Sequence, residues 1–256
     1  VYTYPATIQT TEPLPDVLIV DTNSRLDSSK EAYDKVFHCT KAIKKLGVKQ
    51  FFNKTCSVFR GNIGAEFDAM LDALARDFAV IVLGFPKNGR TTIHGVHYVH
   101  GKKLEESEFR NDPVHPMRKS NLIDILQEQT DRKVDYIDID IVKQGSRILK
   151  NEIDKKKKHC NYLILDVEDQ ITLKIIAEAI KDEKIICGAS GIAEELAKVI
   201  GSPDQDKRVN PVQKCHVGIL CAAGSLMPQT KRQIKTMEEN GFPVFEIKTN
   251  HLFSDS

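Results

Sequence analysis

Short apolar runs alternate along the chain with stretches in which apolar residues recur every three or four positions. This alternation is typical of parallel strands joined by crossover helices. It predicts an α/β fold, an open and mostly parallel sheet with helices on both faces. The predicted strands of this sheet cover residues 17–20, 48–53, 78–83, 134–137, 162–165 and 184–187.

Helix boundaries are marked by capping residues. Ser28 or Ser29 suits the N-cap of a helix over residues 30–46, and Gly47 suits its C-terminal end. Apolar periodicity predicts the other helices of the first part of the chain. These cover residues 61–75, 121–129 and 142–157, and a further helix begins near Ser190.

The last fifty residues begin a second unit. Residues 202–213 are polar and flanked by prolines, which is typical of a linker. Predicted strands at 217–221 and 244–247 flank a helix at 228–240, and this βαβ unit is the start of a second α/β domain. We therefore expect a first domain over residues 1–201 and part of a second over 214–256.

Composition narrows the class of protein. The 256 residues carry 37 basic and 36 acidic side chains, a net charge of +1, so no strong field attracts nucleic acid or an anionic membrane. No apolar run reaches the roughly 18 residues that cross a bilayer, and the first residues do not resemble a signal peptide. These features predict a cytoplasmic protein without a nucleic-acid or membrane partner.

The six cysteines show no C-x-x-C spacing, which is typical of reduced thiols in the cytosol. Cys215, His216 and Cys221 could be considered as zinc ligands. They fall in a predicted buried strand, however, so we expect no metal site there.

Cationic side chains follow the first three predicted strands, where each strand ends. Arg25 follows the first strand, Lys54 and Arg60 follow the second, and Arg90 follows the third. Ligands of open parallel sheets bind beyond the carboxyl ends of the strands. Because an arginine can hold a carboxylate or phosphate through two parallel hydrogen bonds, this spacing predicts a cleft for a small anion.

Neighbouring residues suit an anion that also carries hydroxyl groups. Gly61 and Asn62 open a predicted helix, whose free backbone N–H groups attract anions. The hydroxyls that could read the OH groups of a polyol are those of Thr22, Ser24 and Ser57. The alternative is that the four cations form only surface ion pairs. The carboxylates available for that are Asp21, Glu66 and Asp68.

Two other segments contain residues that could bind a metal ion or a phosphate group. Residues 84–120 form a long irregular stretch with a small hairpin at 96–104, and loops of this length are usually functional. His94, His97 and His100 lie there, but strand periodicity places His97 opposite the other two, so we expect no three-histidine metal site. In the second unit, Gly224 and Ser225 stand between strand and helix, as in a phosphate-binding turn. The chain has no G-x-x-x-x-G-K-[ST] and no G-x-S-x-G motif.

Several motifs, in this order, resemble those of the four-carbon acid sugar kinases, a family of two-domain enzymes, and the resemblance covers nearly the whole chain. The motifs are VDTNSR at 20–25, KTCSVFRGNIGAE at 54–66, GFPKNGRTT at 84–92, VHGKKL at 99–104, EFRNDP at 108–113, GASGIAEEL at 188–196, and Gly224, Ser225, Pro228, Thr230 and Gln233.

The resemblance implies phosphorylation of the terminal hydroxyl of threonate, erythronate or 3-oxo-tetronate, with ATP and Mg²⁺. It implies that Gly224, Ser225 and Thr230 meet the nucleotide phosphates. The residues implied at the sugar acid are Asp21, Ser24, Arg25, Lys54, Ser57, Arg60, Gly61, Asn62, Gly89 and Arg90. The base for the attacking hydroxyl is not identified, because nothing in the spacing distinguishes Asp21 from Asp166.

The chain departs from the family pattern in two ways. In the pattern K-x-D-S-T-x-R-G, Cys56 replaces the Asp and Val58 replaces the Thr. The family's opening D-D-[LF]-T-G-A motif and its closing glycine-rich nucleotide motif are absent from this sequence. We therefore expect an incomplete kinase with little activity alone. The alternatives are a non-catalytic module that binds a small hydroxylated anion, or half of an enzyme completed by another chain. An apolar face on a partial second domain would favour a homo-oligomer.

Overall fold

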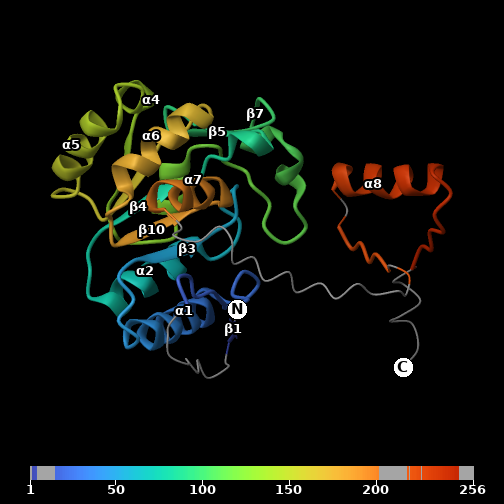
Figure 1. The fold of residues 1–256 in the computed structure, drawn as a ribbon, viewed down its shortest axis with the longest axis horizontal. Helices are drawn as coiled ribbons and strands as arrows, with labels where there is room; N and C mark the ends of the chain where they lie inside the picture. The colour runs from blue at the N-terminus through green and yellow to red at the C-terminus, as the bar shows by residue number, and fades with distance from the viewer. Residues whose placement is uncertain (1, 5–14, 202–217, 219, 226, 248–256) are drawn as a thin grey trace. The chain divides into compact units, whose positions relative to one another are not determined.

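The computed structural model describes residues 2–4, 15–201, 218, 220–225 and 227–247 (Figure 1). The chain divides into two units, Val1–Pro203 and Asp204–Ser256. The expected linker at 202–213 lies outside the described residues. No helix in the described ranges is long and apolar enough to cross a membrane.

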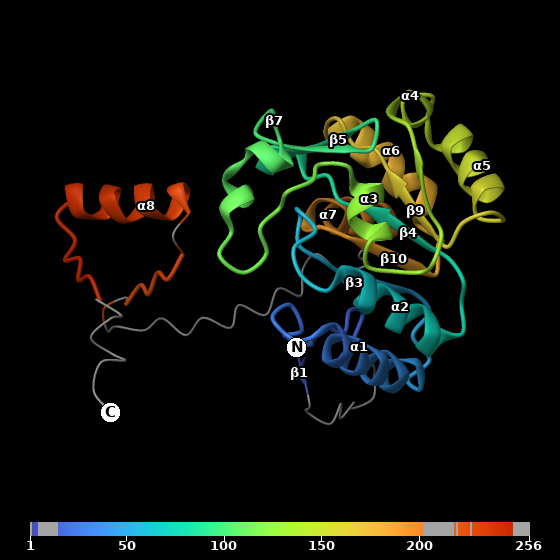
Figure 2. The same cartoon turned by 180° about the vertical axis from the view of Figure 1, so that it is seen from behind.

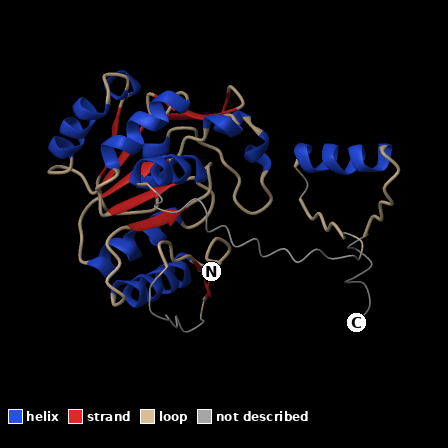
Figure 3. Cartoon of the chain, in the orientation of Figure 1, coloured by secondary structure: helices blue, strands red, loops and turns tan. Residues whose placement is uncertain are grey.

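A five-stranded parallel sheet forms the centre of the first unit (Figure 3). Its strands were predicted at these places to within a few residues, and the predicted α/β class is confirmed. In spatial order they are β3 (Phe51–Lys54), β10 (Ile185–Gly188), β4 (Ala79–Val82), β9 (Tyr162–Leu165) and β8 (Val134–Ile137).

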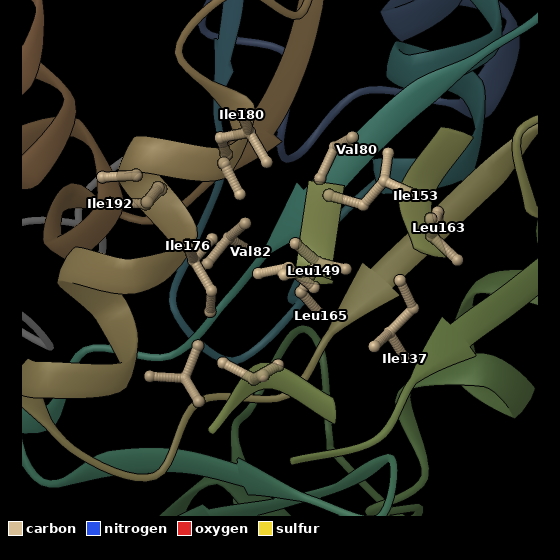
Figure 4. Close-up of a cluster of buried hydrophobic side chains, with 14 of the residues drawn as sticks. Val80, Val82, Ile137, Leu149, Ile153, Leu163, Leu165, Ile176, Ile180 and Ile192 are labelled. Atoms are coloured by element: carbon tan, nitrogen blue, oxygen red, sulfur yellow. The ribbon is translucent and has the colours of Figure 1, made fainter. Parts of the chain in front are cut away.

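Helices cover both faces of this sheet, as predicted. Side chains of β4 and β9 pack against Leu149, Ile176 and Ile192 on one face (Figure 4). The helices that carry these residues are α5 (Ser146–Lys156), α6 (Gln170–Ile180) and α7 (Ser190–Ile200). Every side chain of β4 and β9 is buried, which explains their continuous apolar sequences.

The opposite face is covered by α2 (Ile63–Leu74) and by α3 (Leu122–Gln127), which Figure 2 shows from behind. Phe67 of α2 contacts Tyr162 of β9, with ring centroids 6.0 Å apart. Helix α1 (Ser29–Lys44) packs on α2.

Local sequence signals explain where the helices begin and end. Of the two predicted N-cap residues, Ser28 caps α1, and it also forms a reciprocal capping box with Glu31. The helix predicted over 142–157 is instead two helices, α4 (Ile139–Val142) and α5. Gly145 separates them with a φ of +100°, a backbone conformation that ends a helix and favours glycine.

The apolar run at 17–20 does not form the first strand of the main sheet, so that prediction is wrong. Only β2 (Val20–Asp21) is a strand, and it pairs in parallel with β1 (Tyr2–Thr3) in a separate two-stranded sheet. Val17 and Ile19 are 73% and 54% exposed. An apolar run shows that a strand is possible, but it does not specify which strand pairs with it.

The long segment after β4 forms a small antiparallel sheet that stands on the carboxyl edge of the main one. It consists of β5 (Arg90–Ile93), β6 (Val96–Val99) and β7 (Lys102–Lys103), with the short 3-10 turns η1 (Pro86–Asn88), η2 (Leu104–Glu106) and η3 (Glu108–Asn111) around it. The hairpin at 96–104 is confirmed, whereas β5 was not predicted. A bridge between Thr92 and Val167 ties this sheet to the end of β9.

In the second unit, the predicted helix is present as α8 (Pro228–Glu239). Residues 244–247 form no strand, so this prediction is wrong, and Gly218, Leu220 and Cys221 are also outside any strand. A strand needs a hydrogen-bonded neighbour, and the described part of this unit offers none. Val217 and Ile219 of the other predicted strand lie outside the described residues, as do Cys215 and His216.

A substitution at Gly84, which follows β4, tests the packing at this edge of the sheet. A β-carbon at Gly84 would lie 2.3 Å from Cβ of the buried Val167. Gly84→Ala should therefore lower the free energy of unfolding by about 1–3 kcal/mol, measured by urea denaturation. Gly218→Ala is the matched control, because no atom lies within 4 Å of its added β-carbon. Equal urea midpoints for the two variants would contradict this packing.

Candidate functional site

Two arginines from different parts of the first unit lie over one aromatic ring. The guanidinium carbon of Arg60 is 5.0 Å from the Phe109 ring centroid, and that of Arg90 is 5.8 Å from it. Arg60 follows β3, Arg90 begins β5, and Phe109 belongs to η3. We call these three residues the arginine cleft. The sequence prediction that Arg60 and Arg90 converge is consistent with this geometry.

Arg90 is a buried cation that pairs with no carboxylate among the described residues. The residue is 6% exposed, its Nη1 donates to the Asn88 carbonyl, and its Nε has no hydrogen-bond partner among the described residues. Glu108 acts on it only as a charge at longer range, and burial lowers the pKa of the guanidinium, which stays ionised at neutral pH. A buried charge of this kind is costly unless an anion completes it.

Arg60 is only partly neutralised. Its Nη1 lies 2.6 Å from Oδ2 of Asp112, and this pair is mostly shielded from solvent. Partial burial opposes ionisation of Asp112, but the backbone N–H of His115 and the Arg60 guanidinium lower its pKa. The Nε of Arg60 is buried and unpartnered like that of Arg90. Asp112 and Phe109 belong to the segment at 108–113, which the sequence flagged only through the family resemblance.

His97 joins the loop after β3 to the small sheet. It is fully buried; its Nε2 donates to the Ser57 carbonyl at 2.9 Å, and its Nδ1 accepts from the Thr92 hydroxyl at 3.0 Å. Burial lowers the pKa of His97 to about 4, so the ring is neutral at physiological pH. His94, His97 and His100 have different partners, and His94 and His100 lie outside the strands, each with a positive φ.

The segment that carries Arg25 is held against the start of α2. Asn62 Nδ2 donates to the carbonyls of Ser24 and Asp27, at 3.0 and 2.8 Å. The Ser24 hydroxyl donates to Glu66 at 2.7 Å. A β-carbon at Gly61 would lie 2.9 Å from Cγ of Arg25, so glycine permits this close approach. Asn62 and Ser24 therefore fix the backbone here, while Arg25 itself is exposed.

Three other predicted site residues are two exposed side chains and one glycine with a positive φ. Lys54 and Asp21 are exposed, and Asp21 accepts from the backbone N–H of Asn23. Gly89 has a φ of +68°, and a β-carbon there would lie 2.3 Å from Nδ1 of His100. Of the carboxylates named in the alternative of surface ion pairs, Asp68 pairs with Arg132 and Glu66 accepts from Ser24, whereas Arg60 does form an ion pair, with Asp112.

One further cluster could hold a metal ion by its donor types. Ligand atoms of His94, Asp138 and Asp166 lie within 4.8 Å of one another. The oxygens of Asp166 already accept the backbone N–H groups of Gly95 and Ile139, at 3.0 and 3.2 Å, and the residue is 0% exposed. Asp166 therefore ties the hairpin turn and α4 to the end of β9.

The buried Asp166 carboxyl, which accepts these two hydrogen bonds, makes the free energy of unfolding depend on pH. Burial raises the pKa of Asp166 to about 6. A carboxyl with a raised folded-state pKa contributes stability that is present below about pH 4 and lost as the pH rises through about 6. The excess of the wild-type unfolding free energy over that of Asp166→Asn should shrink by up to about 3 kcal/mol across this window, measured by urea denaturation.

Asp138→Asn is the control, because the pH dependence of the stability that Asp138 contributes should have the opposite sign. The backbone N–H of Asp140 has the largest effect and lowers the pKa of Asp138; burial opposes it, and the His94 ring lowers the pKa further. Its contribution should therefore fade as the pH falls rather than as it rises. If the Asp166→Asn difference grew with rising pH, the account of Asp166 as a buried tether would be wrong.

A cavity of about 550 Å³ lies beside Gly61 and Asn62, outside the arginine cleft. Its other lining residues are mainly amides, hydroxyls and carboxylates, including Asp68, Glu128 and Asp131. These carboxylates repel an anion, so this cavity is less suited to an anion than the arginine cleft is.

The chain is similar in sequence to a known family and to several curated proteins. Residues 3–196 match a family described as "Sugar-binding N-terminal domain". The chain is 30% identical to the 3-oxo-tetronate kinase of Haemophilus influenzae over 237 residues, which is 91% of this chain and 57% of that protein. It is 31% identical to the D-erythronate kinase of Heliobacterium modesticaldum over 244 residues, 94% of this chain and 54% of the relative.

Solved structures give the same result. The crystal structure of Haemophilus influenzae protein HI1011 matches with a TM-score of 0.73 at 26% identity, covering 97% of this chain and 61% of that one. A Bordetella bronchiseptica protein, a domain-swapped dimer with bound citrate, matches with a TM-score of 0.62 at 26% identity over 71% of this chain and 44% of its own. The chain spans about half the length of the curated relatives it matches. It belongs to the four-carbon acid sugar kinase family, and residues 3–196 are its sugar-binding N-terminal domain.

Proposed function

We propose that residues 1–201 of this chain form the substrate-binding domain of an ATP-dependent kinase. The substrate is a four-carbon sugar acid such as 3-oxo-tetronate, erythronate or threonate, phosphorylated at its terminal hydroxyl. The names of the curated relatives support this class of reaction. The bound citrate of the Bordetella bronchiseptica protein supports a preference for hydroxylated carboxylates.

The observation that carries the proposal is the unpartnered guanidinium edge of Arg90. Its Nε is buried without a described acceptor, and the Nε of Arg60 is in the same state over the same Phe109 ring. A substrate carboxylate would supply oxygens to both donors and neutralise the buried charge. Asp112 orients Arg60, and the Phe109 ring fixes the plane of both side chains.

The remaining predicted residues have supporting roles in this proposal. Arg25 and Lys54 are exposed cations that add attraction for an anion at this edge of the sheet. Ser24, Ser57, Gly61 and Asn62 hold the two loops in place, and Gly89 permits the turn before Arg90. Asp21 contributes charge at the end of β2.

The phosphate donor would bind to the second unit. Helix α8 begins after Met227 with no side chain capping its first N–H groups, and Ser225 Oγ accepts from the Met227 N–H. With Gly224 and Thr230, this helix start fits a phosphate group. ATP with Mg²⁺ would supply the phosphoryl group there. Residues 214–256 are then part of a nucleotide-binding domain, and a homo-oligomer is part of the same proposal, supported by the domain-swapped neighbour.

Thermal unfolding in the presence of each sugar acid tests the proposal. At roughly 100 times its dissociation constant, a bound acid should stabilise the chain by about 2.7 kcal/mol. Erythronate, threonate and 3-oxo-tetronate are each titrated with and without Mg-ATP. If none of the acids raises the unfolding temperature, the cleft does not bind this class of substrate.

Arg90→Met separates binding from folding. Methionine keeps the apolar contact with Phe109 but removes the buried charge, so the ligand-free variant should unfold within about 1 kcal/mol of the wild type. Its stabilisation by sugar acid should be lost. Lys102→Met, which removes an exposed charge on β7, should keep that stabilisation. A full shift in Arg90→Met would contradict the role of Arg90.

A further inference from the structure

Asp112 is held in one position beside the arginine cleft. Its Oδ1 accepts the backbone N–H groups of Val114 and His115, at 3.1 and 2.8 Å. Its Oδ2 lies 2.6 Å from Nη1 of Arg60, and its side chain is 15% exposed. Because both oxygens have partners, the carboxylate is fixed and keeps a negative charge next to the proposed anion site.

The two guanidinium groups and this carboxylate together carry one positive charge in excess. Among the described residues, Arg90 pairs with no carboxylate, and Asp112 is the one acid that pairs with Arg60. Burial opposes ionisation of Asp112, but the backbone N–H of His115 and the Arg60 guanidinium lower its pKa, so it is ionised at neutral pH. Glu108 is exposed, so water and salt screen its charge.

The donors that would receive an anion are buried, which makes the charge of that anion important. The Nε atoms of Arg60 and Arg90 have no described hydrogen-bond partner, and Arg90 is 6% exposed. An anion that accepts from them leaves water, and the cost of this step rises with the square of its charge. A carboxylate with one charge balances the excess, whereas a dianion brings a second charge that Asp112 repels. The exposed cations Arg25 and Lys54 offset this repulsion little, because solvent screens them.

We propose that Asp112 is a specificity-determining residue, which makes the arginine cleft select a singly charged carboxylate over a doubly charged group such as a phosphate monoester. This role rests on the proposed function, because there the cleft receives the carboxylate of the sugar acid. The product of that reaction carries a carboxylate at one end and a phosphate at the other. By this selection the carboxylate end enters the cleft and the phosphate end does not, so Asp112 also fixes the direction in which the acid binds.

Two small anions of different charge test this role on the full chain. Glycolate is a hydroxylated carboxylate with a single negative charge, and sulfate is doubly charged at neutral pH. Each is titrated at constant ionic strength, and binding is followed by the NMR signals of the arginine Nε–H groups. Sulfate should bind to the wild type at least about threefold more weakly than glycolate, because Asp112 repels it and it loses more hydration.

Asp112→Asn removes the charge and retains the hydrogen bonds of Oδ1. The asparagine oxygen can still accept the N–H groups of Val114 and His115, but the neutral amide cannot neutralise Arg60. Both anions should bind more tightly and sulfate should gain more, so the ratio of the sulfate to the glycolate dissociation constant should fall at least about fivefold. A purely structural role of Asp112 would change both constants together and leave this ratio unchanged. Circular dichroism melting curves confirm that the variant is folded.

Glu108→Gln is the matched control. It removes the same charge from the adjoining turn η3, but Glu108 is exposed and acts on Arg90 only as a charge at longer range. Its ratio should stay within about twofold of the wild-type ratio, because solvent screens an exposed charge. An equal fall in both variants would contradict the proposal, since selectivity would then follow net charge and not the pairing of Asp112 with Arg60.

Sulfate binding as tightly as glycolate to the wild type would overturn the proposal, whether or not Asp112→Asn folds. So would a folded Asp112→Asn variant with the wild-type ratio, or the lack of any Nε–H shift with either anion. Neither anion is a sugar acid, so these outcomes are separate from failure of the proposed function. Selection of glycolate over sulfate without binding of erythronate would support the role of Asp112 and count against the proposed substrate.

Discussion

A guanidinium buried without a carboxylate is the constraint on which the rest of this site depends. Arg90 is 6% exposed and has an unpartnered Nε, and taking such a charge out of water costs several kcal/mol unless something offsets it. The Asn88 carbonyl and the Phe109 ring offset part of that cost. The remaining cost would be lowered by an anion bound here, which is what the proposed substrate carboxylate would supply.

The fold brings this charge into position by joining two distant segments. The loop after β3 carries Cys56 and Arg60, and the small antiparallel sheet carries Arg90. His97 connects them, and its burial keeps the ring neutral, so the connection adds no further positive charge near Arg90. The main sheet contributes a rigid edge, and Asp166 fastens the hairpin turn to it.

The sequence predicted the parallel sheet and its helices well, because the buried strands are continuously apolar and the helices have capping residues such as Ser28. It placed Arg60 and Arg90 at neighbouring strand ends, but it missed Phe109 and Asp112, which reach the cleft through a loop with no periodic signal. It misplaced residues 17–20, since strand pairing is decided by tertiary contacts. It did not predict that Asp166 accepts the backbone N–H groups of Gly95 and Ile139, because burial cannot be read from a strand-end position alone.

The Nε–H resonances of the arginines, observed by NMR in arginine-labelled protein, test the central claim most directly. Titration with erythronate should shift the Nε–H signals of Arg90 and Arg60 and slow their exchange with solvent, because both donors acquire an acceptor. The signal of Arg132, which already pairs with Asp68 and Asp72, should stay in place. If the Arg90 signal did not move under saturating sugar acid, the buried guanidinium would not be the anion site.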